Sequence, residues 1–256
     1  AARELAGAER KEAAADIAQA LAASPELRTR EELRGALVRL LGQDLGHDAE
    51  AWKALAGGAP AKAAALPAFP EFFGAPVASD AVAVLIDTSR SMDWMGRLQA
   101  ALDGCARYVG ALPDTTGFAV ADISRTFEPF REGGLVLGAE NRKAAQEWIA
   151  ERLTRPRVDV KTALQETLER YPNADTICLA TDSHPWGATA EEQSRETLET
   201  FRRLNRARQV RLVIALVMPG GRYEPSERTE AEIIERIEYL RELAEESGGV
   251  LVELNE

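Results

Sequence analysis

Three oxygen-bearing side chains fall within five residues of one another, directly after an apolar stretch of the chain. They are Asp87, Ser89 and Ser91, and the apolar stretch is residues 81–86. A carboxylate followed at alternate positions by two hydroxyls presents all three groups to one side if the backbone stays extended. Hard oxygen donors of this kind suit Mg²⁺, Mn²⁺ or Ca²⁺. Taken singly the pattern is a weak signal, because Asp and Ser are also common in strand-to-helix turns and helix N-caps.

Two later residues extend the pattern. Thr162 opens a helical segment, and Asp182 follows the apolar stretch 177–181. Together with these, residues 87–92 (Asp-Thr-Ser-Arg-Ser-Met) resemble the Asp-x-Ser-x-Ser motif of von Willebrand factor A domains. That motif begins the family's metal-ion-dependent adhesion site, which also uses a threonine before a later helix and an aspartate after the fourth strand. The resemblance covers about residues 79–256.

The resemblance implies a role for each of these five side chains. Ser89, Ser91 and often Thr162 would bind the cation directly, while Asp87 and Asp182 would bind it directly or through water. Mg²⁺ is the expected ion, with Mn²⁺ or Ca²⁺ as alternatives. Because neutral hydroxyls leave the ion only partly neutralised, a protein partner can complete its coordination shell with an Asp or Glu carboxylate. The resemblance therefore implies a cation-dependent protein–protein interaction module, of the adhesion or scaffold kind.

The chain departs from the family pattern at two loops. Lys161 stands directly before Thr162, where the family usually has Gly, and Ser183-His184-Pro185-Trp186 follows Asp182, where the family favours Gly. Neither change removes a ligand. Both bear on the shape of the loops and on the affinity for the cation.

Two tryptophans, Trp94 and Trp186, lie on loops expected to rim the site. Exposed tryptophans are favoured anchors in protein interfaces, so both are candidate partner contacts. Packing of each ring back onto the core is an equally good interpretation. His184 shares the loop with Trp186, and we interpret it as a solvated loop histidine because no second His or Cys supports a ligand set.

From residue 80 onward, short apolar runs alternate with amphipathic helical patterns, which is typical of a doubly wound, mostly parallel sheet with helices on both faces. This is an α/β, Rossmann-like fold class. Strands are predicted at 81–87, 117–122, 176–181, 210–218 and 250–254, and helices near 96–111, 140–153, 162–171, 191–207 and 229–247.

The first part of the chain has a different composition. Residues 1–57 are rich in Ala, Leu, Glu and Arg at helical spacing and predict a small helical segment, with Asp48 capping a short third helix. Residues 33–52 resemble the terminal unit of bacterial HEAT-repeat proteins that precede such A domains. Residues 58–78 contain several Gly, Pro and Phe residues and are expected to be a linker that packs on the next domain, 79–256.

Composition argues against several classes of function. The formal net charge of −11 repels a phosphate backbone, so nucleic acid is a poor candidate partner. No apolar run approaches the roughly 20 residues that span a bilayer, so no membrane insertion is expected from this chain. The two cysteines, Cys105 and Cys178, lie in apolar segments and are predicted to be buried free thiols.

An enzyme is the rival class of function. The chain offers no Gly-rich dinucleotide loop, Walker loop, nucleophile elbow or zinc-binding cysteine set, so a binding module is favoured. One alternative is a metal-assisted hydrolase, or a phosphoryl-transfer enzyme with Asp87 as its nucleophile and Lys161 nearby. Such enzymes need a second carboxylate close to the nucleophile. Position 89 is Ser instead of Asp, which disfavours this alternative. Another alternative is a metal-independent scaffold with a degenerate site.

Overall fold

The computed structural model describes residues 2–62, 66–124, 126–156, 159–182, 190–218 and 230–254. The chain divides into two compact units, Ala1–Phe69 and Pro70–Glu256. The division falls inside the segment 58–78 that the sequence marks as a linker.

The first unit consists of three helices, α1 (Ala2–Ala23), α2 (Leu27–Leu41) and α3 (Ala49–Ala56). They pack around a small apolar core centred on Trp52, whose indole Nε1 donates a hydrogen bond to the Gly46 carbonyl at 2.9 Å. Asp48 caps α3, because its carboxylate accepts a hydrogen bond from the Ala51 backbone N–H at 2.9 Å. The predicted helical segment and its cap are confirmed, and the HEAT-like resemblance stays a prediction.

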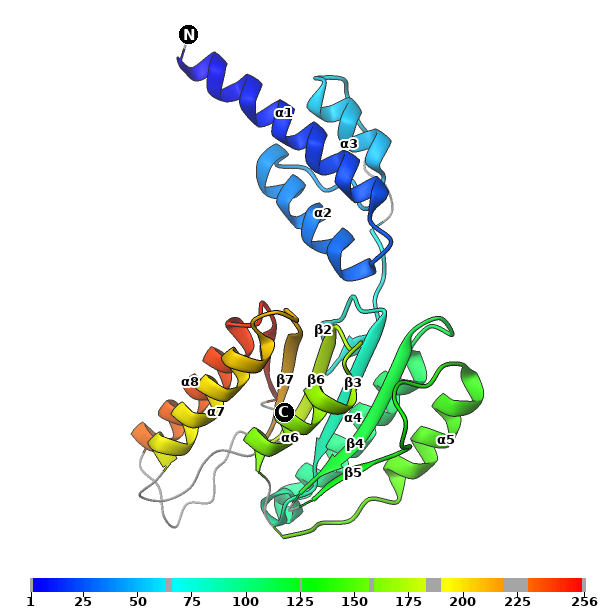
Figure 1. The fold of residues 1–256 in the computed structure, drawn as a ribbon, viewed down its shortest axis with the longest axis vertical. Coiled ribbons are helices and arrows are strands. Elements are labelled where there is room, and N and C mark those ends of the chain that lie inside the picture. The colour runs from blue at the N-terminus through cyan, green and yellow to red at the C-terminus, as the bar shows by residue number, and fades with distance from the viewer. Residues whose placement is uncertain are drawn as a thin grey trace. The chain divides into compact units, whose positions relative to one another are not determined.

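The second unit is built on one six-stranded sheet with the strand order β5-β4-β3-β6-β7-β8 (Figure 1). All neighbouring strands run parallel except β4 and β5, which are antiparallel. The strands are β3 (Ala81–Asp87), β4 (Gly117–Ile123), β5 (Phe127–Pro129), β6 (Thr176–Thr181), β7 (Arg211–Val217) and β8 (Val250–Leu254). The five predicted strands are confirmed to within one residue at each end, and β5 is an additional edge strand.

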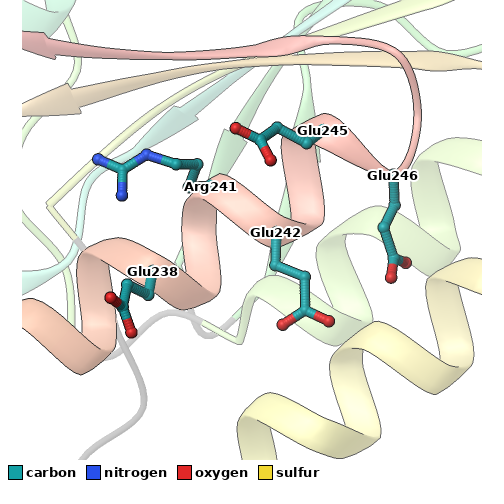
Figure 2. Close-up of a pocket in the computed structure, with 5 residues that line it drawn as sticks. All are labelled: Glu238, Arg241, Glu242, Glu245 and Glu246. Atoms are coloured by element: carbon teal, nitrogen blue, oxygen red, sulfur yellow. The ribbon is translucent and has the colours of Figure 1, made fainter.

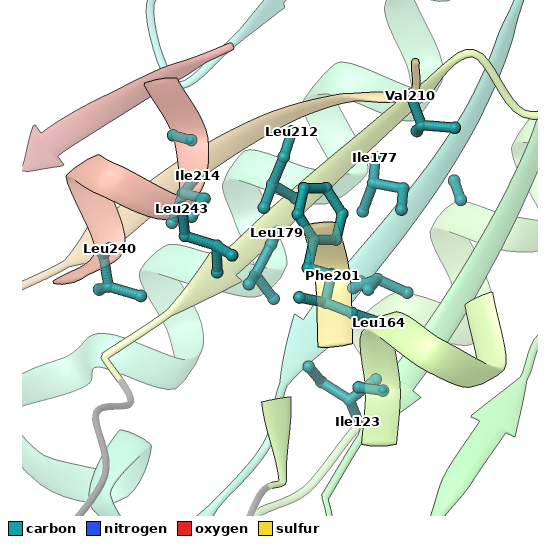
Figure 3. Close-up of a cluster of buried hydrophobic side chains, with 14 of the residues drawn as sticks. Ile123, Leu164, Ile177, Leu179, Phe201, Val210, Leu212, Ile214, Leu240 and Leu243 are labelled. Carbon is teal, nitrogen blue, oxygen red and sulfur yellow. The ribbon is translucent and has the colours of Figure 1, made fainter. Parts of the chain in front are cut away.

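Helices cover both faces of this sheet, as the sequence predicts (Figure 1). One face packs against α4 (Arg97–Ala111) and α5 (Ala139–Ala150), and the other packs against α6 (Val160–Arg170), α7 (Ala190–Asn205) and α8 (Glu230–Glu245). Alternate residues of each strand serve the two cores, since strand side chains point alternately to opposite faces. Figure 3 shows the core between the sheet and helices α6, α7 and α8. It contains Leu179 and Leu212 of the sheet and Phe201 and Leu240 of the helices. Cys105 and Cys178 are buried free thiols in the core between the sheet and helices α4 and α5, as predicted.

A short hairpin precedes the sheet, formed by β1 (Glu71–Phe72) and β2 (Ala75–Pro76). Phe72 is fully buried and its ring meets Tyr108 of α4 edge-on, with 5.3 Å between ring centroids. The neighbouring Phe73 lies directly over Gly104, where any Cβ would come within 2.2 Å of the ring. The hairpin is therefore held on α4 by two aromatic side chains.

Candidate metal site

The candidate site lies where β3 and β6 end. These strands are parallel neighbours, with Ile86 paired to Ala180, so their carboxyl ends reach the same edge of the sheet. Asp87 is the last residue of β3, and Asp182 directly follows β6. In open parallel sheets this edge is where ligands bind.

The structure brings four of the five predicted ligands together. Ser89 Oγ and Ser91 Oγ lie 3.0 Å apart, and Ser91 Oγ donates a hydrogen bond of 2.8 Å to Asp182 Oδ1. Asp87 joins them through its Oδ1, which accepts a 2.7 Å hydrogen bond from the Ser89 backbone N–H. Its Oδ2 accepts a 2.5 Å hydrogen bond from Thr181 Oγ1, which ties the end of β3 to the end of β6. The two serines and two aspartates therefore form one connected cluster.

Thr162 stands apart from this cluster in the described hydrogen bonds. It lies in the first turn of α6, is exposed, and donates through Oγ1 to Asp159 Oδ2 at 2.8 Å. Its backbone N–H also donates to Asp159 Oδ1 at 3.1 Å, so Asp159 is the N-cap of α6. The family role of Thr162 as a direct ligand stays a prediction, and Asp159 is a neighbour that sequence reasoning did not single out.

Burial makes both aspartates of the cluster difficult to ionise. Asp87 has no exposed surface, and this burial together with the nearby Asp182 raises its pKa to about 7. Burial likewise raises the pKa of Asp182, while the Ser91 hydroxyl and Arg97 act in the opposite direction. Two buried carboxylates side by side favour the uptake of positive charge.

Arg97 supplies part of that positive charge, and sequence reasoning missed it. Its Nη1 donates to Asp182 Oδ2 at 2.6 Å, and the residue is only 7% exposed. Its guanidinium also lies 4.8 Å from the centre of the Trp94 ring. The available signal was a basic residue at the start of a helix, where the helix dipole disfavours positive charge.

A third buried carboxylate, Asp122 of β4, contacts the residue between Asp87 and Ser89. Asp122 has no exposed surface, and its Oδ1 accepts a 2.5 Å hydrogen bond from Thr88 Oγ1, while Arg155 Nε lies 3.6 Å from its Oδ2. The Arg155 backbone N–H donates to the Thr88 carbonyl at 2.7 Å, and its side chain pairs with Glu128. These contacts anchor the loop between Asp87 and Ser89. Sequence reasoning missed Asp122, although a charged residue inside an apolar strand was a visible signal.

Of the two loops expected to rim the site, the structure describes the one that carries Trp94. Trp94 is half-buried against Arg97, and the adjacent Met95 is 48% exposed with a positive φ of 51°. Trp186 and His184 lie outside the described residues. Lys161 pairs with Glu196 of α7 at 2.8 Å.

The geometry of the serine pair is compatible with a Mg²⁺ ion. Adjacent corners of an octahedron with metal–oxygen distances of about 2.1 Å lie about 3.0 Å apart, and the two serine oxygens have a separation of 3.0 Å. Because the Ser91 hydroxyl donates its proton to Asp182, Ser89 is the donor in the contact between the two serines, and one lone pair of Ser91 stays available to a cation. Among the described residues, no three His, Cys, Asp or Glu side chains gather closely enough to hold a metal.

A hollow elsewhere on the second unit offers less chemistry. It lies along α8 and is lined by Glu238, Arg241, Glu242, Glu245 and Glu246 (Figure 2). Two of these carboxylates are already paired, since Arg202 lies 3.0 Å from Glu242 and also pairs with Glu246. We therefore interpret it as a solvated, ion-paired helix surface.

Comparison with solved structures identifies the fold. The chain resembles a von Willebrand factor type A protein from Catenulispora acidiphila with a TM-score of 0.53 and 18% sequence identity, over 69% of this chain and 39% of that one. The second unit, Pro70–Glu256, has a von Willebrand factor A fold and is called the A domain from here on. The A domain resembles two further structures less well. They are an aerotolerance-related membrane protein from Bacteroides fragilis (TM-score 0.46, 14% identity, 68% of this chain and 90% of that one) and mussel byssus proximal thread matrix protein 1 with a zinc-occupied MIDAS motif (TM-score 0.45, 16% identity, 68% and 43%).

The resemblance of the A domain is one of structure. No protein-family model and no curated protein matches the sequence. None of the described helices is long and apolar enough to cross a bilayer.

The raised pKa of Asp87 predicts how the stability of the metal-free A domain depends on pH. Below about pH 4 the carboxyl is protonated in both the folded and the unfolded state, and between that value and 7 the folded state alone keeps the proton. The contribution of Asp87 to the free energy of unfolding therefore falls as pH rises through this window. Urea unfolding in chelator at about pH 5.5 and about pH 8 measures it, with Asp87→Asn as the non-titrating comparison. We expect the wild type to lose more stability than Asp87→Asn between the two pH values, and an equal loss would contradict the assignment.

Proposed function

We propose that the A domain binds one divalent cation, with Mg²⁺ preferred over Mn²⁺ and Ca²⁺, and uses it to grip a carboxylate of a protein partner. Ser89 and Ser91 would hold the ion directly, and Asp87 and Asp182 would balance its charge. Thr162 would join them from α6. The observation that carries the proposal is the hydrogen-bonded cluster of both serines and both aspartates at the carboxyl edge of the sheet.

Charge explains why the partner group should be acidic. The two aspartates would neutralise a divalent ion, and Arg97 adds one further positive charge to the same cluster. The loaded site would therefore be net positive. A carboxylate is a hard oxygen donor, so it can both complete the shell of Mg²⁺ and cancel that excess.

The surface around the cluster suits a protein partner. Arg90 and Met95 are exposed beside the motif, and Trp94 is half-buried. An arginine, a methionine and a tryptophan are residue types enriched in protein interfaces. Trp94 and Trp186 therefore remain our candidate partner contacts.

An enzymatic use of Asp87 receives little support from the geometry. A nucleophilic carboxylate needs an accessible oxygen, but Asp87 has no exposed surface and both oxygens accept hydrogen bonds within the fold. Lys161, the cation such a reaction would use, is paired with Glu196. Binding is the better proposal.

Peptide selection tests the partner chemistry directly. A library of random peptides displayed on phage is captured by the wild-type chain in Mg²⁺ and eluted with chelator. We expect the eluted peptides to be enriched in Asp or Glu, and each selected peptide to lose binding when that residue is replaced by Asn or Gln. The matched control is the Asp87→Ala chain, which should select no chelator-sensitive peptides. Binding that survives chelator would support the metal-independent scaffold instead.

A further inference from the structure

Arg97 occupies a position at which a cation is electrostatically costly. It is the first residue of α4, directly after Gly96 at the N-cap. The N-terminus of a helix carries a partial positive charge, and the first turn of α4 contains no acidic residue to offset it. At 7% exposure the guanidinium also has little access to water. A buried cation in such a place requires a close anion.

Asp182 is an anion that meets this requirement. The carboxylate accepts from Arg97 Nη1 at 2.6 Å through Oδ2 and from Ser91 Oγ at 2.8 Å through Oδ1. Both residues are almost fully buried at the side chain, with 8% exposure for Arg97 and 1% for Asp182. Removing one member of such a pair leaves an uncompensated buried charge, so the two are strongly coupled.

The same carboxylate belongs to the proposed metal site. An ion held by the serine pair and the Arg97 guanidinium would both draw on Asp182, and the two positive charges would repel one another. Repulsion between charges a few ångströms apart in a partly buried site is not screened as it would be in water. The positive charge of Arg97 therefore lowers the affinity of the site for any divalent ion.

We propose that Arg97 is a resident cation of this site, which neutralises Asp182 when no metal is bound and thereby weakens the binding of a divalent ion. The proposal rests on the function proposed above. It makes Arg97 a residue that sets the affinity of the site for a divalent ion.

Trp94 keeps the resident cation in place. Its ring lies 4.8 Å from the Arg97 guanidinium, on the rim of the site, and such contacts are attractive. Arg97 is thus held between a carboxylate inside the site and an aromatic ring at its edge. These two contacts favour a guanidinium that stays at the site when a metal binds.

Calorimetric titration of Mg²⁺ into the full chain tests the proposal. Arg97→Gln removes the charge and retains a polar side chain of similar reach, and Arg97→Lys is the matched control that retains the charge. We expect Arg97→Gln to bind Mg²⁺ at least about tenfold more tightly than the wild type, which corresponds to about 1.4 kcal/mol. Arg97→Lys should stay within about threefold of the wild type. Equal or weaker binding by a folded Arg97→Gln chain would overturn the proposal.

Failure of the parent function gives a different result. If neither the wild type nor folded Arg97→Gln takes up Mg²⁺, Mn²⁺ or Ca²⁺, the metal site itself is wrong. Uptake by the wild type with no gain in Arg97→Gln overturns the role of Arg97 alone.

A second measurement covers the case in which Arg97→Gln fails to fold. The guanidinium N–H signals of the wild-type chain are recorded by nuclear magnetic resonance during a Mg²⁺ titration, with Arg97→Lys used to assign the Arg97 signal. If the arginine shares Asp182 with the ion, its signal should shift in parallel with metal uptake. An unchanged Arg97 signal at saturating Mg²⁺ would overturn the proposal.

Discussion

Replacing both Ser89 and Ser91 with alanine is expected to remove Mg²⁺ uptake, with a loss of affinity of at least about a hundredfold. Changes to groups that only orient metal ligands already cost about 10–100-fold in affinity, and these two oxygens are the proposed direct ligands. Two buried carboxylates would remain: both oxygens of Asp87 still accept from Ser89 N–H and Thr181, and Asp182 still accepts from Arg97, so only Asp182 Oδ1, released from Ser91, would replace the two lost hydroxyls. Calorimetric titration of Mg²⁺ into the double variant and the wild type measures the difference.

Ser79→Ala is the matched control for the serine pair. Ser79 is a buried serine just before the opposite end of β3, where its hydroxyl donates to Asp175 Oδ1 at 2.6 Å. Its loss should lower the free energy of unfolding by about 1 kcal/mol, as for a typical side-chain hydrogen bond, and leave Mg²⁺ affinity unchanged. Saturable Mg²⁺ uptake by the folded Ser89→Ala/Ser91→Ala chain with the wild-type affinity would exclude the serine pair as ligands.

The elements that a sequence predicts well are those with long, regular patterns. The runs that became β3 and β7 are almost wholly apolar, as strands covered on both faces must be, and they were predicted with nearly correct ends. The strand β5 was missed because it has only three residues and ends in Pro129, which places it at the sheet edge. The hairpin of β1 and β2 was missed for the same reason, since two-residue strands have no period to detect.

The candidate site also has a part that the sequence predicts and a part that only the structure shows. The cluster around Asp87 and Asp182 depends on the pairing of β3 with β6. The family resemblance implied that the two aspartates belong to one site, but the periodicity of the sequence does not predict which strands pair. The contacts of Arg97 with Asp182 and of Thr88 with Asp122 link residues 85 and 34 positions apart. Such pairs follow from which strands and helices are neighbours, so local sequence patterns do not contain them. A charge in an unfavourable place, such as Arg97 at a helix start, still marks where a partner must be sought.

The turn between α8 and β8 shows how narrowly the sheet fixes one backbone position. Gly248 and Gly249 form this turn, and the structure gives them different roles. Gly248 adopts a positive φ of 72° and has open space around it. Gly249 has an ordinary φ, yet a Cβ there would lie 1.9 Å from the carbonyl oxygen of Leu212 and 2.6 Å from its carbonyl carbon. Leu212 belongs to β7 and is buried in the core of Figure 3.

Gly249→Ala should therefore destabilise the A domain far more than Gly248→Ala. The clash in Gly249→Ala is with main chain, which cannot rotate away as a side chain can, so β8 must separate from β7 or the turn must rebuild. Overpacking of this kind costs at least about 3 kcal/mol when the backbone has to move. Gly248→Ala meets no atom and costs about 1 kcal/mol, the penalty for a side chain in the left-handed region. Urea unfolding of both variants and the wild type, followed by circular dichroism, gives the comparison. Similar losses in the two variants would mean that conformation at the turn, and not the contact with Leu212, is what requires glycine there.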